Sequence, residues 1–231
     1  MEKRAFRRIK PIYLMHQKGL FNSEILAVID GISEIRKLIF ELTGINIGFK
    51  NFKNWGNSND DLEPYQGVEW YINIGKQASS RRTQLNVSAI QDVIAREPWK
   101  DVYQGGTDHY DVFVVKEDMY AGDNNFVIGE ANRLIGTTIS TYRFRDLDEQ
   151  RQYECIKTEV MHELGHVFGA PSEQRTHNIE ESLGEHCTNT CVMRQGLLVP
   201  QDWIKLTEDR ILYEPMCQDC KNDLRQYLTR K

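Results

Sequence analysis

Apolar side chains recur along the first half of the chain with two different spacings. Between residues 23 and 43 they follow at steps of four and three, which predicts a helix with one apolar stripe: Val28, Ile32, Ile35, Ile39 and Leu42. Gly44 is suited to end this helix, because glycine readily adopts the left-handed backbone that closes helices. Residues 45–49 and 68–74 alternate between apolar and polar and therefore predict strands, and a first strand is expected at 11–15.

The second half of the chain predicts a sheet followed by a long helix. Strands are expected at 109–116, 125–131 and 136–144, and helices at 86–99, from Asp146 or Asp148 to Gly169, from Pro200 to about Tyr213, and after Cys220. This order predicts a mixed α/β (α+β) fold with one main sheet. Because the composition changes after Gly169, we expect an N-terminal subdomain at residues 1–169 and a small C-terminal subdomain at 170–231.

Composition and charge exclude several classes of protein. The 231 residues carry a net charge of −5 that is spread along the chain, so no basic stripe for nucleic acid is expected. No stretch approaches the roughly 20 apolar residues that cross a membrane. The basic first residues are not followed by the apolar run of a signal peptide, so we expect a cytoplasmic protein. The sequence leaves the oligomeric state open.

Four of the five cysteines lie close together near the carboxyl end. They form one CxxxC and one CxxC pair: Cys187, Cys191, Cys217 and Cys220. In a reducing compartment such clustering indicates a structural zinc site, since four thiolates bind zinc tetrahedrally. Two other interpretations are unpaired thiols and a redox pair, although a redox CxxC would need a thioredoxin-like setting that is absent here. Cys155 lies outside this set and is expected to be a small buried side chain.

The long predicted helix carries an HExxH motif at residues 162–166. Residues four apart lie on one helix face, so His162 and His166 can bind one metal ion. Glu163 lies one step around the helix, where a carboxylate can act as general base. A chance motif on a solvated helix is the alternative. An apolar ridge beside the histidines argues against it, formed by Ile156, Val160, Leu164 and Phe168.

A catalytic zinc needs a third protein ligand, and the position three residues after Gly169 is Ser172. The candidates further along are His177, His186, Glu173, Glu180, Glu181 and Glu185. The run His186-Cys187, Cys191-Val192-Met193 and the later CxxC together resemble the archaemetzincins. Residues 125–144, ahead of the helix, are also similar to that family.

The resemblance implies a metzincin-like fold and a zinc metallopeptidase that hydrolyses peptide bonds through a zinc-activated water. It implies two zinc ions, with these residues: Glu163 as general base; His162, His166 and His186 at the catalytic zinc; Cys187, Cys191, Cys217 and Cys220 at the structural zinc; Met193 and Gly169 in support. A peptide or protein is the expected partner, with no nucleic acid and no membrane. Endopeptidase and aminopeptidase action both stay open. The alternative function is a zinc-stabilised binding or regulatory module whose peptidase site has decayed.

The spacing departs from the family. Sixteen residues separate Gly169 from His186, where the family has two, so fourteen residues, about 170–183, form an insertion. Its polar composition predicts a surface loop, and we expect its deletion to leave the metal bound. The alternatives to His186 as third ligand are His177 and a glutamate such as Glu180 or Glu181.

Overall fold

The computed structural model describes residues 9–56, 63–100, 106–181 and 184–230. The chain divides into two compact units. The helical unit consists of Met1–Ile9, Leu26–Ile47 and Leu147–Lys231, and the sheet unit of Lys10–Ile25 and Gly48–Asp146. Both sides of Gly169 fall within the helical unit, and the subdomain boundary predicted there stays a prediction.

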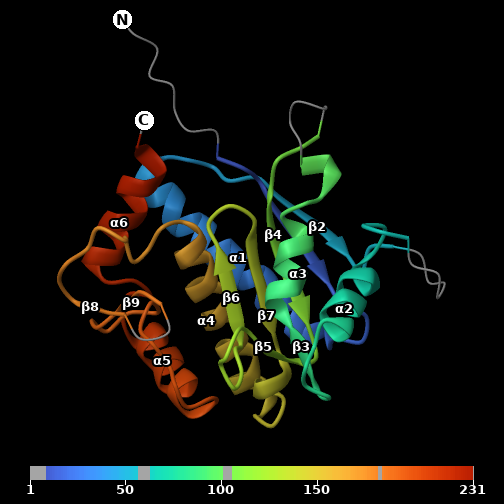
Figure 1. Cartoon of the computed structure of the whole chain (residues 1–231). Helices are drawn as coiled ribbons and strands as arrows, with labels where there is room; N and C mark the ends of the chain where they lie inside the picture. Colours follow the sequence, from blue (N-terminus) through green and yellow to red (C-terminus); the bar gives the residue numbers. More distant parts are fainter. Residues whose placement is uncertain (1–8, 57–62, 101–105, 182–183, 231) are drawn as a thin grey trace, which may run out of the picture. The chain divides into compact units, whose positions relative to one another are not determined.

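The sheet unit is built on a five-stranded mixed sheet (Figure 1). Its strands, in spatial order, are β2 (Phe49–Lys53), β1 (Ile12–His16), β4 (Tyr110–Val115), β7 (Gly136–Ser140) and β6 (Gly129–Asn132). The first four are parallel, and β6 is antiparallel to β7 at the edge. Two short strands, β3 (Gln84–Asn86) and β5 (Asp118–Tyr120), form a separate parallel pair. The predicted mixed α/β fold with one main sheet is confirmed.

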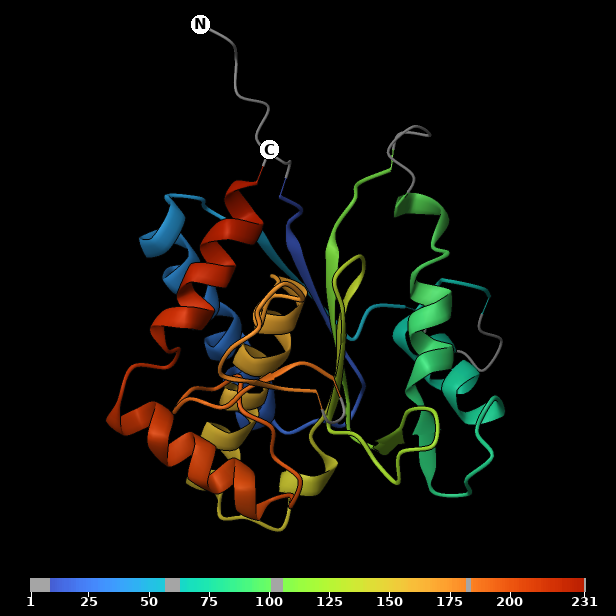
Figure 2. The same cartoon turned by 60° about the vertical axis from the view of Figure 1, so that its left-hand side comes forward.

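Helices α2 (Val68–Gln77) and α3 (Val87–Ile94) lie side by side on one face of the main sheet (Figure 2). The strand predicted at 68–74 is therefore wrong. The buried residues of α2 are Val68, Tyr71, Ile72 and Gly75, which have the three- and four-residue spacing of a helix. The apolar positions of this short segment fit both the two-residue period of a strand and the 3.6-residue period of a helix, and burial against α3 favours the helix. A side chain at Gly75 would come within 2.7 Å of Ile90, so the two helices pack closely.

Other predicted elements are shorter than expected. The strand predicted at 125–131 is β6 and begins only at Gly129, and the strand predicted at 136–144 is β7 and ends at Ser140. The strand predicted at 45–49 begins only at Phe49, which pairs with Ile12, the first residue of β1. The last bond to β1 on this side is accepted by the Gly48 carbonyl oxygen from the Ile12 N–H at 2.8 Å, so the strand has little to pair with before Gly48. The helix predicted at 86–99 ends at Ile94, and Pro98 begins a short 3-10 turn, η1 (Pro98–Lys100). Proline restricts the residue before it to extended backbone, which breaks the helix.

The helical unit contains most of α1 (Asn22–Thr43), α4 (Glu149–Val167), α5 (Gln201–Leu212), α6 (Gln218–Thr229) and the hairpin of β8 (Ile179–Glu180) and β9 (His186–Cys187). Helices α1 and α4 pack closely, because a Cβ at Gly31 would lie 2.7 Å from Val160. Thr207 of α5 donates to Thr158 of α4 at 2.9 Å. The ridge predicted on α4 is confirmed, since all four of its side chains are fully buried.

Helix α6 starts three residues earlier than predicted, with Cys217 at its N-cap. The pattern predicts a helix that begins after the CxxC pair, whereas Cys220 lies in the first turn of α6. None of the helices in the described part of the chain combines the length and apolar composition needed to span a membrane.

Candidate functional site

Helix α4 positions the HExxH motif and is closed at both ends. The side chain of Asp148 accepts a hydrogen bond from the backbone N–H of Arg151 at 3.0 Å, which caps the start. At the other end Gly169 has φ +83°, and a Cβ there would lie 2.5 Å from the ring of Tyr227. The positive φ and the close approach of Tyr227 both require glycine at this position, where the chain turns just after α4.

Three histidine side chains converge in the helical unit. His162 and His166 from α4 and His186 from β9 each place one ring nitrogen within 4.8 Å of the others. The two Nε2 atoms of His162 and His166 are 3.1 Å apart. We call these three residues the histidine cluster. The structure thus brings together the three residues that the sequence assigned to the catalytic zinc.

Hydrogen bonds to backbone carbonyls select the tautomers of two of these rings. His162 donates from Nδ1 to the Val192 carbonyl oxygen at 2.7 Å, and His186 donates from Nδ1 to Gly184 at 3.1 Å. In the neutral rings Nε2 then carries the lone pair, which is the form that binds a metal. Burial, and then the nearby His186 ring, lower the pKa of His162 to about 3, so that imidazole stays neutral.

The histidine cluster fits a zinc ion. Two nitrogens at 2.0–2.1 Å from one tetrahedral metal ion are about 3.3 Å apart. The observed separation of 3.1 Å between Nε2 of His162 and Nε2 of His166 is close to this value. Lone pairs that face each other at such a distance repel unless a proton or a cation lies between them. Three imidazoles, two of them buried with their tautomers fixed by hydrogen bonds, are a donor set that suits zinc.

Met193 packs directly beneath the motif. Its side chain is fully buried, and a Cβ at Gly165 would lie 2.3 Å from its sulfur. Only glycine therefore fits at position 165, next to His166. The Met193 carbonyl oxygen also accepts a hydrogen bond from the Cys187 N–H at 2.7 Å. The carbonyl group of the preceding residue, Val192, orients the His162 ring, so residues 192–193 hold the histidine cluster in position.

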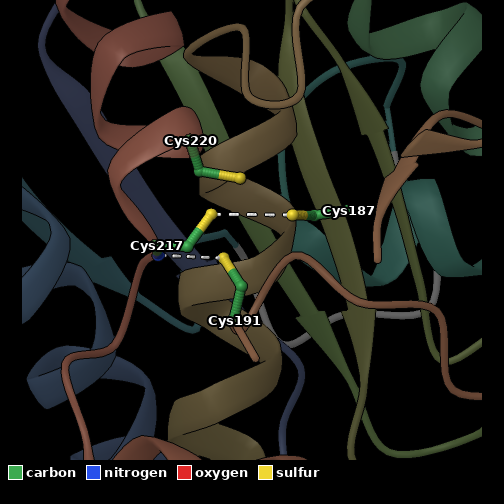
Figure 3. A group of neighbouring side chains, drawn as sticks. All are labelled: Cys187, Cys191, Cys217 and Cys220. Atoms are coloured by element: carbon green, nitrogen blue, oxygen red, sulfur yellow. Dashed lines mark hydrogen bonds between the residues drawn. The ribbon is translucent and has the colours of Figure 1, made fainter. Parts of the chain in front are cut away.

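The four cysteines of the two pairs also converge (Figure 3). Cys187 lies on β9, Cys191 on the following loop, and Cys217 and Cys220 at the start of α6; we call them the cysteine cluster. Their sulfurs all lie within 4.8 Å of one another, and those of Cys187 and Cys217 are 3.6 Å apart. All five cysteines of the chain carry thiols, and Cys155 is fully buried, as expected.

The cysteine cluster fits a zinc ion as well. Two sulfurs at 2.3 Å from one tetrahedral zinc are about 3.8 Å apart, close to the observed 3.6 Å. Cys217 stands at the N-terminus of α6, where the helix dipole favours a thiolate. Hydrogen bonds with the other thiols, that with Cys187 first, lower the pKa of Cys217 below its usual value.

Comparison with known proteins finds relatives that match part of the chain. No family model matches the chain. It is 42% identical over 81 residues to an archaemetzincin from Nanoarchaeum equitans, a match that covers 35% of this chain and 36% of that protein. It is 36% identical over 83 residues to an archaemetzincin from Archaeoglobus fulgidus, covering 35% of this chain and 42% of that protein. These matches span less than half the length of the curated relatives. The chain is archaemetzincin-like.

Solved structures show that the archaemetzincin likeness extends to the whole fold. The crystal structure of archaemetzincin from Methanopyrus kandleri aligns with a TM-score of 0.61 and 21% identity, covering 96% of this chain and 97% of that chain. A zinc-dependent peptidase from Methanocorpusculum labreanum aligns with a TM-score of 0.52 and 16% identity, covering 92% and 99%.

The structure describes the segment predicted to be an insertion, residues 170–183, except for residues 182 and 183. Its β8 pairs with β9, which places Ile179 opposite Cys187 and Glu180 opposite His186. The insertion is mostly exposed, as expected, but it is hydrogen-bonded to the strand that carries two ligand residues. The expectation that deletion leaves the metal bound at the histidine cluster stays a prediction, and the pairing shows that deletion would also remove contacts to β9.

Arg175, within the insertion, is a residue that the sequence analysis missed. It is 9% exposed and donates to the sulfurs of Cys187 at 3.4 Å and Cys220 at 3.1 Å. Its guanidinium also pairs with Asp223 of α6. Nothing in the sequence distinguished this arginine from the charged residues around it. Two positive-charge-assisted bonds to the cysteine cluster favour the thiolate form of these side chains.

Glu159 is a second missed residue. It is fully buried on α4, one turn before Glu163, which is 6% exposed. Burial, and then the charge of Glu163, raise the pKa of Glu159. The i, i+4 spacing of the two glutamates is a signal that could have revealed this pair in the sequence.

The rival third ligands lie apart from the histidine cluster. The His177 side chain is 67% exposed and lies 3.7 Å from Asp219. Among the described residues, the groups of His, Cys, Asp and Glu side chains able to hold a metal contain none of the other rivals: Glu173, Glu180, Glu181 and Glu185. The geometry therefore favours His186 as the third ligand.

Proposed function

We propose that this chain is a zinc-dependent peptidase whose catalytic metal is held by His162, His166 and His186. The observation that carries the proposal is the convergence of three imidazole nitrogens within 4.8 Å. Two of them come from one turn of α4, directly beside the buried Glu163. The archaemetzincin relatives support the same reading, although each match covers only part of their length.

A zinc ion bound at these three imidazoles would supply Lewis acidity that polarises a peptide carbonyl and makes water a stronger nucleophile at neutral pH. Glu163 is the general base in this proposal: its carboxylate takes the proton of the attacking water and returns it to the departing amine. Val192 and Gly184 hold the rings of His162 and His186 in the tautomer that presents Nε2. Met193 packs against Gly165 and so holds the neighbouring Val192 carbonyl group in position to bond His162.

The cysteine cluster is proposed to hold a second, structural zinc ion. A closed site of four thiolates leaves no position for substrate, so its contribution is to stability. It would join the start of α6 to the segment that follows His186, and so hold the third ligand in place. Because this site needs thiols rather than disulfides, we propose a reducing compartment, the cytoplasm, as the place of action.

Replacing Glu163 with glutamine tests the proposed peptidase activity. Glu163→Gln keeps the shape of the side chain and removes the base, so we expect zinc content to stay unchanged. Hydrolysis of a peptide library should fall by about 10²–10⁴-fold. Glu149→Gln, the same change in the exposed first turn of the same helix, is the matched control and should retain full activity. Equal activity in Glu163→Gln and wild type would refute the mechanism.

The masses of the products distinguish the two kinds of peptidase. An endopeptidase releases internal fragments from peptides with blocked ends, whereas an aminopeptidase acts only where the amino terminus is unblocked. A wild-type protein that holds zinc at the histidine cluster and cleaves no peptide of either type would instead support the binding or regulatory module.

A further inference from the structure

A third group of side chains able to hold a metal lies in the sheet unit, and none of its residues belongs to the histidine or cysteine cluster. Glu97, just before η1, His109, just before β4, and Asp111, on β4, each place one ligand atom within 4.8 Å of the others. All three are at most 4% exposed. We call them the acid–histidine cluster. No part of the proposed peptidase function uses these residues.

Each member of the cluster has one polar atom tied to an outer partner. The Tyr71 hydroxyl donates to Glu97 Oε1 at 2.5 Å, and the Lys100 ammonium donates to Asp111 Oδ2 at 2.5 Å. His109 donates from Nδ1 to the Thr107 carbonyl oxygen at 2.7 Å, and its ring stacks on Tyr13. Such outer contacts orient the ligands of metal sites and fix the tautomer of a ligating histidine.

The remaining polar atoms point at one another. His109 Nε2 lies 3.3 Å from Asp111 Oδ1 and 3.8 Å from Glu97 Oε2. Both carboxylate oxygens are buried and have no hydrogen-bond partner among the described residues. With Nδ1 of His109 as the donor to Thr107, the neutral ring presents a lone pair at Nε2. Three lone-pair donors therefore face one small volume.

With a neutral His109, the carboxylates of the cluster outnumber its cations. Two carboxylates face one ammonium, that of Lys100, which lies 2.5 Å from Asp111 and 3.4 Å from Glu97. Burying an uncompensated charge is costly, so a second positive charge is expected between the three side chains.

We infer that the acid–histidine cluster is a binding site for a divalent transition-metal ion such as zinc, held by Glu97 Oε2, His109 Nε2 and Asp111 Oδ1. One imidazole and two carboxylates form a donor set that suits borderline ions of this class. The site is closed, so the ion has a structural role. It joins the segment after α3 to the start of β4 within the sheet unit.

Zinc titration with native mass spectrometry tests this site in the full chain. In excess zinc we expect His109→Gln and Asp111→Asn each to bind one ion fewer than the wild type. Asp118→Asn, which removes another buried carboxylate of the sheet unit, should bind the wild-type number. The test compares the number of zinc ions bound by each variant with the number bound by the wild type, so the result does not depend on whether the histidine cluster binds zinc. Equal numbers in folded wild type and both variants, as verified by circular dichroism, would overturn the site; a proton on His109 would then balance the cluster.

A second measurement needs no variant. Crystals of the wild-type protein soaked in zinc should give an anomalous-scattering peak at the zinc edge between Glu97, His109 and Asp111. A peak there supports the site even where the variants fail to fold. The lack of a peak there, in crystals that show zinc elsewhere in the chain, would overturn it.

Discussion

At the scale of single residues, Arg175 joins the insertion to the cysteine cluster. Arg175→Met keeps the apolar stem and removes the guanidinium that bonds Cys187 and Cys220. We expect zinc affinity at the cysteine cluster to fall by about 10–100-fold, as for other contacts that orient metal ligands. Competition with a colorimetric chelator measures this change. Arg225→Met, on the exposed side of α6, should behave as wild type, and equal affinities in all three proteins would contradict the role of Arg175.

Gly165 is the second test at this scale. Alanine in place of a helical glycine usually stabilises a protein, by about 1 kcal/mol. Here the added Cβ would lie 2.3 Å from the buried sulfur of Met193, and overpacking of this kind costs about 1–3 kcal/mol. We therefore expect Gly165→Ala to lower the free energy of unfolding in denaturant titrations. The same change in a Met193→Ala background should cost less; an equal cost in both backgrounds would show that this contact does not decide the effect.

At the scale of elements, the insertion is the feature for which sequence and structure differ most. Its polar composition predicts an exposed loop, and most of its residues are indeed exposed. Composition could not reveal that β8 pairs with β9 or that Arg175 turns inward, because both depend on partners far along the chain. A pairing partner is a property of the folded chain and is not encoded in the local pattern.

Removing the insertion tests this element directly. Deletion of residues 170–183 takes away both β8 and Arg175, so we now expect the cysteine cluster to lose affinity for zinc. Zinc bound per chain, measured after dialysis against a weak chelator, should be lower than in the wild type. A deletion variant that retains wild-type zinc content would show that the insertion is a passive surface loop, as its composition alone suggests.

Long periodic elements were predictable and short ones were not. The apolar stripe of α1 and the ridge of α4 extend over several turns, so their period is unambiguous, and the buried residues match it. The run at 68–74 is too short to separate two periods, and its packing against α3 determines that it is helical.

The candidate site residues follow the same rule, because a motif with a fixed spacing can be found in the sequence. The HExxH motif and both cysteine pairs have such a spacing and were predicted, whereas Glu97, His109 and Asp111 were not. Those three carry no shared spacing, and the fold alone brings them together.

At the scale of the whole molecule, metal binding is expected to contribute to stability. Ions that bind only the native state raise the free energy of unfolding, and thiolate sites that form on folding do so strongly. We therefore expect an excess of chelator to lower the Tm of the wild type in calorimetry. Cys217→Ser should begin with a lower Tm and show a smaller further decrease. If chelator leaves the wild-type Tm unchanged, the cysteine cluster is not a structural metal site.

The division of the chain into units could not be predicted from composition. Leu26–Ile47 and Leu147–Lys231 form one unit although about 100 residues separate them. Close packing at Gly31 against Val160 links these segments, and a single glycine within a helical pattern does not identify its partner. The histidine and cysteine clusters both lie within this helical unit.

If the HExxH helix and His186 form one zinc site, zinc binding should depend on His186 and not on His177. Native mass spectrometry of His186→Ala and His177→Ala, side by side with wild type, measures the zinc bound per chain. We expect His186→Ala to lose one zinc ion relative to wild type and His177→Ala, whose exposed ring lies outside the histidine cluster, to lose none. Loss of the ion in His177→Ala together with full retention in His186→Ala would contradict the assignment of His186.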